Sequence, residues 1–188
     1  MNTVVSPNRT SGIVAGLSSY FLWGFLPLYF ILLGTTGPWE IVSWRIVWSL
    51  VFCVGILAVT KQLRPTIALM RNRRFVWLTV AAGILIYLNW QFYIIANLTG
   101  RVLEGSLGYF INPLVTIVLG VLVLGEKLRP LQWVAMGLAA VAVVIIIVGY
   151  GEVPWLSFIL AGSFGAYGLV KNRLGGKLTA TQSLTFET

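Results

Sequence analysis

The chain alternates between long apolar stretches and short polar or charged segments. The segment between Glu104 and Glu126 shows this pattern most clearly, because its 21 residues carry no charge. A helix needs about 20 predominantly apolar residues to cross the hydrocarbon core of a bilayer. We therefore interpret residues 104–124 as a membrane-spanning helix.

The same pattern recurs along the chain and predicts an all-α fold, a polytopic membrane helix bundle. The six predicted spans are residues 12–33, 41–60, 75–97, 104–124, 131–149 and 155–170. Residues 1–11 form a polar tail in front of the first span. The apolar run that follows is longer than that of a secretory signal and has no small-residue cleavage site, so we expect it to be retained.

Composition supports a membrane location and charge supports one orientation. Hydrophobic residues make up 58% of the chain and charged residues 10%, whereas soluble domains carry about 25% charged residues. The net charge is +8, and the basic residues lie between the apolar stretches. With antiparallel spans, eleven lysines and arginines fall on one side and only Arg101 on the other. The positive-inside rule then puts the amino terminus in the cytoplasm. We expect no nucleic-acid partner.

The residue types present argue against catalysis and metal binding. The chain has no histidine, no aspartate and one cysteine, Cys53. Intramembrane hydrolysis usually relies on paired aspartates, serine with histidine, or metal ligands. Every lysine falls in a predicted cytoplasmic connection, which disfavours a serine–lysine pair. We therefore predict no catalytic residues, no metal site and no cofactor.

Polar side chains inside the third and fourth spans mark a candidate site. Asn89, Tyr93 and Asn97 are four residues apart and share one helix face. Asn112 lies eight residues from Glu104, as Asn89 lies eight residues from Asn97, so the two amides are expected at similar depth. Intramembrane polar residues often mark a binding cavity. The alternative is that the two amides hydrogen-bond only to each other.

Prolines and an arginine add to these candidates. Pro27 frees the backbone carbonyl of Trp23, and Pro113 frees that of Tyr109, since proline has no N–H to donate. Both prolines are predicted to bend their helices. Arg45 lies just inside the second span. It either extends to the membrane surface or faces inward as a cation for an anionic group.

A short motif in the first span returns in the sixth. Ser19–Gly24 and Ser163–Gly168 both read serine, aromatic, two residues, aromatic, glycine, and the second copy includes Tyr167. The copies are five spans apart, so they run in opposite directions, as in inverted repeats of secondary transporters. The tail LTATQSLTFET is too short to cross the membrane and is interpreted as the beginning of a seventh helix.

Several sequence blocks resemble one transporter family. The blocks SSYFLWGFLPLYF, EIVSWRIVWS, LNWQFYIIAN, EGSLGYFINPLVTIVLGVLVLGEKL and FGAYGLVKN resemble, in this order, the RarD-type permeases, chloramphenicol-sensitive proteins of the EamA branch of the drug/metabolite transporters. The resemblance implies ten helices in two inverted five-helix repeats around a central cavity. Residues 12–150 would be the first repeat and residues 151–188 the truncated beginning of the second, so four helices would be missing.

These observations favour a secondary transporter for a small organic metabolite or drug-like solute. We expect an exporter in the bacterial inner membrane that works by alternating access, with the lipid bilayer and a small molecule as its partners. Homodimerisation, and a half-size or non-transporting subunit, remain open alternatives. Proton coupling would require Glu104, Glu187 or a group in the missing half. The candidate cavity-lining residues are Trp23, Arg45, Asn89, Tyr93, Tyr109, Asn112 and Tyr167.

Overall fold

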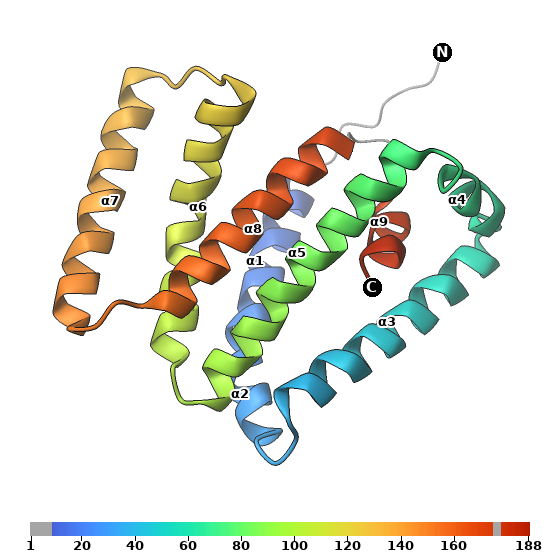
Figure 1. Cartoon of the computed structure of the whole chain (residues 1–188), viewed down its shortest axis with the longest axis horizontal. Helices are drawn as coiled ribbons and strands as arrows, with labels where there is room; N and C mark the ends of the chain where they lie inside the picture. The colour runs from blue at the N-terminus through green and yellow to red at the C-terminus, as the bar shows by residue number, and fades with distance from the viewer. Residues whose placement is uncertain (1–8, 175–177) are drawn as a thin grey trace. The chain divides into compact units, whose positions relative to one another are not determined.

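The computed structural model describes residues 9–174 and 178–188, and those residues form helices joined by short connections (Figure 1). Residues 1–8 of the predicted tail and Lys177 of the predicted charge pattern lie outside the described residues. The helices are α1 Arg9–Gly24, α2 Leu26–Leu32, α3 Pro38–Val59, α4 Leu63–Leu69, α5 Arg73–Leu98, α6 Val102–Leu124, α7 Pro130–Tyr150, α8 Trp155–Leu174 and α9 Ala180–Glu187. The expected all-α membrane helix bundle is confirmed.

Five stretches of the described chain are long and apolar enough to cross a membrane. They are Gly12–Leu32, Pro38–Val59, Arg73–Leu98, Val102–Leu124 and Pro130–Tyr150. Each matches a predicted span to within a few residues. The predicted sixth span corresponds to α8, which is not among these five. Lys171 and Arg173 lie in its last turn, so Lys171 belongs to a helix and not to the connection that the sequence predicted.

The amino-terminal unit, which includes α1 and α2, differs from the predicted single helix. Helix α1 ends at Gly24 and α2 begins at Leu26, with Pro27 in the first turn of α2. Proline is tolerated in a first helical turn because the N–H groups there have no partner within the helix. The interruption therefore falls at Phe25, two residues before the predicted bend.

The second unit, residues 36–188, contains α3 to α9. Helix α8 packs along both α5 and α6, and α9 packs against α3 and α5 (Figure 1). Helix α7 returns beside α6 after a turn in which Gly125 has a left-handed backbone with φ 69°. An apolar cluster, formed by Leu107, Ile111, Val143 and Ala161, holds α6, α7 and α8 together.

Two glycines allow α6 and α8 to approach closely. A Cβ atom on Gly108 of α6 would lie 2.8 Å from the Cβ of Leu160. A Cβ atom on Gly165 of α8 would lie 2.7 Å from a methyl carbon of Val115. Small residues at membrane helix interfaces permit this close packing. The contact between α6 and α8 therefore depends on glycine at two positions along the helices, Gly108 and Gly165.

Two short helices lie outside the predicted spans. Helix α4 occupies part of the basic segment 61–74, and its Pro65 lies in the first turn, where proline fits. Helix α9 forms within the tail that was interpreted as the beginning of a helix. The side chain of Thr179 caps α9 by accepting a hydrogen bond from the Gln182 N–H at 3.3 Å.

Candidate functional site

A row of aromatic rings crosses three helices of the second unit. The row begins with Trp90 and Tyr93 of α5, continues through Tyr109 of α6 and ends with Phe164 and Tyr167 of α8. The centroids of consecutive rings lie 6.0, 5.3, 6.4 and 5.7 Å apart. We call these five residues the aromatic row. The first three pairs meet edge-to-face, which is favourable at these separations, and the fourth pair is tilted. Three predicted cavity residues, Tyr93, Tyr109 and Tyr167, are therefore linked by direct ring contacts and by Phe164.

Asn89 is buried beside this row and connects α5 to both neighbouring helices. Its amide nitrogen donates to the Leu160 carbonyl at 2.9 Å and to the Ser163 hydroxyl at 3.1 Å, both in α8. Its amide oxygen accepts a hydrogen bond from the Tyr109 hydroxyl at 3.3 Å. The amide oxygen of Asn112 accepts instead from Thr116 of its own helix at 3.3 Å. The alternative in which Asn89 bonds only to Asn112 is therefore wrong.

Arg45 of α3 extends the row at its Trp90 end. The guanidinium carbon lies 4.0 Å from the centroid of the Trp90 ring, which is a cation–π contact. The Nε atom of Arg45 is buried and has no hydrogen-bond partner within the described part of the chain. The arginine thus contacts a neighbouring helix through its planar face and leaves one donor unused.

The opposite end of the row meets a partly buried ion pair. The Tyr167 hydroxyl donates to the Glu187 carboxylate of α9 at 2.7 Å, and the Lys171 ammonium lies 2.6 Å from the same carboxylate. Ser183 donates to this carboxylate at 2.8 Å, and Lys171 also contacts the Ser183 hydroxyl. Because Glu187 accepts from both α8 and α9, this cluster fixes α9 against α8.

Among the remaining predicted residues, no described contact joins the row to Trp23, Asn112, Pro27 or Pro113. Trp23 belongs to the amino-terminal unit, where its ring packs edge-to-face with Tyr20 at 6.5 Å. Pro113 lies inside α6, which continues on both sides of it. Asn97 donates to the Tyr93 carbonyl at 2.8 Å. The spacing rule correctly put Asn89, Tyr93 and Asn97 on a buried face.

Glu104 is buried, although its sequence position suggested a flanking charge. Its carboxylate pairs with the Arg101 guanidinium at 2.5 Å and accepts from the Tyr150 hydroxyl at 3.1 Å and the Leu156 N–H at 3.3 Å. Desolvation lowers the pKa of Arg101, but the Glu104 carboxylate and the Tyr150 hydroxyl together outweigh it and raise that pKa above its ordinary value. Glu104 therefore ties the beginning of α6 to α7 and α8.

Gln91 is a residue that sequence reasoning passed over. Its side chain is buried, and neither its amide nitrogen nor its amide oxygen has a hydrogen-bond partner among the described residues. Buried polar groups are normally hydrogen-bonded, so an unbonded one needs an explanation. Trp90 and Phe164 were also missed, because aromatic residues are common in membrane helices and spacing alone does not show which rings meet. Among the described residues, no group of three or more histidine, cysteine or acidic residues could hold a metal ion.

Comparison with known proteins gives this arrangement a family. Residues 10–148 match the EamA-like transporter family. Protein RarD of Streptomyces exfoliatus is 45% identical over 180 residues, which are 96% of this chain and 56% of that protein. Protein RarD of Escherichia coli (strain K12) is 37% identical over 163 residues, 87% of this chain and 55% of that protein. The uncharacterized transporter YojE of Bacillus subtilis (strain 168) is 41% identical over 180 residues, 94% of this chain and 60% of that protein.

The chain spans between 55 and 60% of the length of these three relatives. No solved structure matches the chain. The family match covers most of the sequence and the membrane-spanning helices described above. The chain belongs to the EamA-like transporter family.

Proposed function

We propose that this chain contributes to a transporter that moves a small organic solute across the membrane. The observation that carries the proposal is the aromatic row with Asn89 and Arg45 beside it, which joins α3, α5, α6 and α8 by described contacts. Polar groups gathered inside a membrane bundle are costly unless they serve a pathway or a partner. The transporter names of similar proteins support the same class and fit a protein without enzymatic activity.

The chemistry of the row indicates a substrate with both an aromatic or apolar part and polar groups. The ring of Tyr167 would offer its face to an apolar or cationic part, and Trp23 of the amino-terminal unit stays a separate prediction for the same role. Asn89, Tyr93, Tyr109 and Asn112 would donate or accept hydrogen bonds. Arg45 would hold an anionic group, and its stacking on Trp90 supports the inward-facing interpretation.

Two buried side chains with unbonded polar atoms support binding: Arg45, which contacts Trp90, and Gln91, which follows Trp90 along α5. Arg45 Nε and both amide atoms of Gln91 are buried without partners within the described residues. An unmet hydrogen bond in a buried site costs about 1–3 kcal/mol. A bound substrate that completed these bonds would recover part of this cost. We therefore add Gln91 to the predicted cavity residues.

We further propose export from the cytoplasm by alternating access, in the inner membrane of a bacterium. The two inverted repeats predicted from the Ser19–Gly24 and Ser163–Gly168 motifs would rock around a midplane site, as in other secondary transporters. Residues 12–150 would form the first repeat. The amino terminus would lie in the cytoplasm, as the distribution of basic residues favours.

Energy coupling is assigned to Glu187 in preference to Glu104. Glu104 is held by Arg101, Tyr150 and Leu156, which lie outside the row. Glu187 accepts directly from Tyr167, a member of the row, and pairs with Lys171. Tyr87 lines the same pocket as Glu187 and is the further titratable group there. Protonation of Glu187 would remove the negative charge that pairs with Lys171 and so weaken the contact between α8 and α9.

A transport assay on the full-length protein tests the proposed site. Asn112→Ala, Trp23→Ala and Tyr109→Leu variants are compared with Trp133→Ala, whose ring lies half exposed on α7. We expect the three site variants to lose most uptake or export in proteoliposomes while inserting normally, and Trp133→Ala to retain it. Full transport by both Asn112→Ala and Trp23→Ala would refute the site.

Cysteine labelling tests the proposed orientation. The native Cys53 is buried and gives little background. A membrane-impermeant maleimide should label Thr99→Cys in intact cells, because the connection between α5 and α6 is predicted to face outward. It should not label Asn72→Cys, between α4 and α5, until the cells are opened. The reverse labelling pattern would contradict the orientation.

A further inference from the structure

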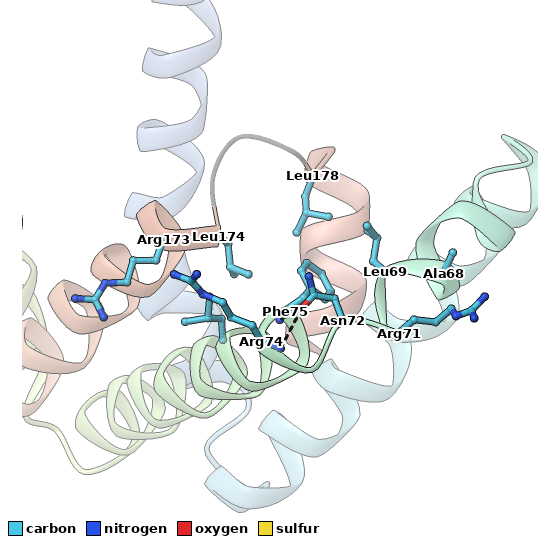
Figure 2. A pocket seen from close by; sticks show the side chains of 10 residues that line it. Ala68, Leu69, Arg71, Asn72, Arg74, Phe75, Arg173, Leu174 and Leu178 are labelled. Atoms are coloured by element: carbon cyan, nitrogen blue, oxygen red, sulfur yellow. Dashed lines mark hydrogen bonds between the residues drawn. The ribbon is translucent and has the colours of Figure 1, made fainter.

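A pocket of about 650 Å³ lies where α4, the beginning of α5 and the end of α8 meet. Figure 2 shows its lining side chains, which come from these segments and from Leu178. Three of them are arginines: Arg71, Arg74 and Arg173. The walls between them are largely apolar, with Leu69, Phe75 and Leu174 among the lining residues. The pocket therefore combines positive charge with a hydrophobic surface.

The three arginines have no described acidic partner. The described ion pairs of the chain involve Arg101 and Lys171 instead, and none of the residues that line the pocket is acidic. In Figure 2, Arg74 extends from α5 toward the end of α8, which carries Arg173, whereas the guanidinium of Arg71 points the other way. Arg74 and Arg173 are thus the best-placed pair for one anionic group. Guanidinium groups bind phosphate well because their donors match its oxygens.

A second, almost wholly apolar pocket adjoins the first. It has a volume of about 270 Å³ and shares Leu78 and Arg173 with the basic pocket. Its other lining residues include Leu119 and Val123 of α6 and Ala166 and Leu169 of α8. It extends farther from the end of α8, because Ala166 lies eight residues before Leu174, and it reaches the end of α6 at Val123. Charge at the helix ends and an apolar groove below it are the two parts of a phospholipid-shaped site.

We propose that these adjoining pockets bind one anionic phospholipid. Its phosphate would lie between Arg74 and Arg173, with Arg71 adding to the positive potential. One acyl chain would lie in the groove bounded by Leu78, Val123 and Leu169. Basic pockets between membrane helices are suited to anionic headgroups. This site is separate from the aromatic row and does not depend on the transport proposal.

The apolar groove favours a lipid over a free phosphate compound. A soluble phosphate would use the arginines and leave the groove unfilled. A lipid would use both, and it is already concentrated at the membrane surface where α5 begins and α8 ends. A zwitterionic lipid would fill the groove, but its headgroup would be attracted less strongly to the arginines because it has no net negative charge.

Native mass spectrometry of the full chain in detergent tests this proposal with three probes. They are phosphatidylglycerol, phosphatidylcholine with the same acyl chains, and glycerol phosphate. We expect phosphatidylglycerol to bind at least fivefold more tightly than phosphatidylcholine, and glycerol phosphate to bind weakly. Arg74→Gln and Arg173→Gln should each weaken phosphatidylglycerol binding about fivefold, as expected for one arginine at a membrane surface. Arg64→Gln, an arginine of α4 outside the pocket, should change it less than twofold.

A second pair of variants tests the groove without changing charge. Val123→Trp fills the groove and should reduce binding of phosphatidylglycerol but not of glycerol phosphate. Leu122→Trp is the matched control, because Leu122 is 76% exposed and does not line the groove. Equal affinity for the two lipids, or equal effects of Arg64→Gln and Arg74→Gln, would overturn the proposal. Tight binding of glycerol phosphate that Val123→Trp leaves unchanged would also overturn it, since the ligand would then be the phosphate alone.

Discussion

The amide nitrogen of Asn89 donates a hydrogen bond to the backbone carbonyl of Leu160 at 2.9 Å, which joins the middle of α5 to α8. The same nitrogen donates to Ser163, and the amide oxygen accepts from Tyr109 of α6. One buried side chain thus connects three helices. In this position Asn89 is both a structural link and a neighbour of the proposed substrate groups.

Replacement of Asn89 by leucine should destabilise the bundle. Hydrogen bonds between membrane helices contribute about 0.6–2 kcal/mol each, and Asn89→Leu removes three. We expect its free energy of unfolding to fall by about 2 kcal/mol, measured by thermal or denaturant unfolding in detergent. Asn112→Leu is the control, because the described bond of Asn112 is to Thr116 in its own helix. An equal loss of stability in both variants would contradict this role of Asn89.

The ion pair between Arg101 and Glu104 should respond unequally to loss of either partner. The Arg101 side chain is 42% exposed, whereas that of Glu104 is fully buried. If Glu104 becomes glutamine, Arg101 can be hydrated by water. If Arg101 becomes glutamine, a buried carboxylate loses its counter-charge, and removal of one partner from a buried pair is strongly destabilising.

We therefore expect Arg101→Gln to lower the unfolding free energy more than Glu104→Gln does. The double variant should be more stable than Arg101→Gln alone, since it removes the unpaired charge. The unfolding free energies of the parent and the three variants, measured in the same detergent, test this order. A double variant less stable than either single variant would exclude this explanation.

The close contact between α6 and α8 should not tolerate a methyl group at Gly108. The added Cβ would lie 2.8 Å from the Cβ of Leu160 and 3.1 Å from the Ser157 carbonyl oxygen. Both atoms belong to or adjoin the backbone of α8, so neither can move alone. Gly108→Ala should cost about 1–3 kcal/mol of stability, as overpacking usually does. Gly162→Ala in α8, which meets nothing within 4 Å, should be neutral or slightly stabilising in the same unfolding assay.

Sequence pattern was sufficient for the positions of the long helices. Membrane spans are set by the length of apolar runs, a property local to each segment, and the predicted 131–149 became Pro130–Tyr150. The face shared by Asn89 and Tyr93 also followed from helix geometry alone. Residue spacing shows which side chains share one face of a helix, but it does not show which other helix packs against that face. The partner of Asn89 is therefore an α8 carbonyl and not Asn112.

Tertiary contacts decided what the sequence left open. Glu104 resembled a flanking charge because its burial depends on Tyr150 and Leu156, which are distant in sequence. Lys171 lay beyond the predicted sixth span, yet it belongs to the last turn of α8 and forms an ion pair with Glu187 of α9. The short helix α4 was missed because its seven residues lie within a basic, proline-containing segment.

A Gln91 variant can distinguish an effect on substrate binding from an effect on the stability of the fold. Its amide is buried with neither polar atom bonded among the described residues, so the side chain contributes desolvation cost without a compensating bond. Replacing such a group with an apolar residue of similar size is nearly neutral or stabilising. Gln91→Leu should therefore unfold at the same temperature as the parent or higher.

If Gln91 binds the substrate, transport by the full-length protein should fall about tenfold in Gln91→Leu, which corresponds to one lost hydrogen bond of about 1.4 kcal/mol. Asn89→Leu should lower both stability and transport, so the two variants together distinguish a binding residue from a structural one. Unchanged transport in Gln91→Leu would remove Gln91 from the site.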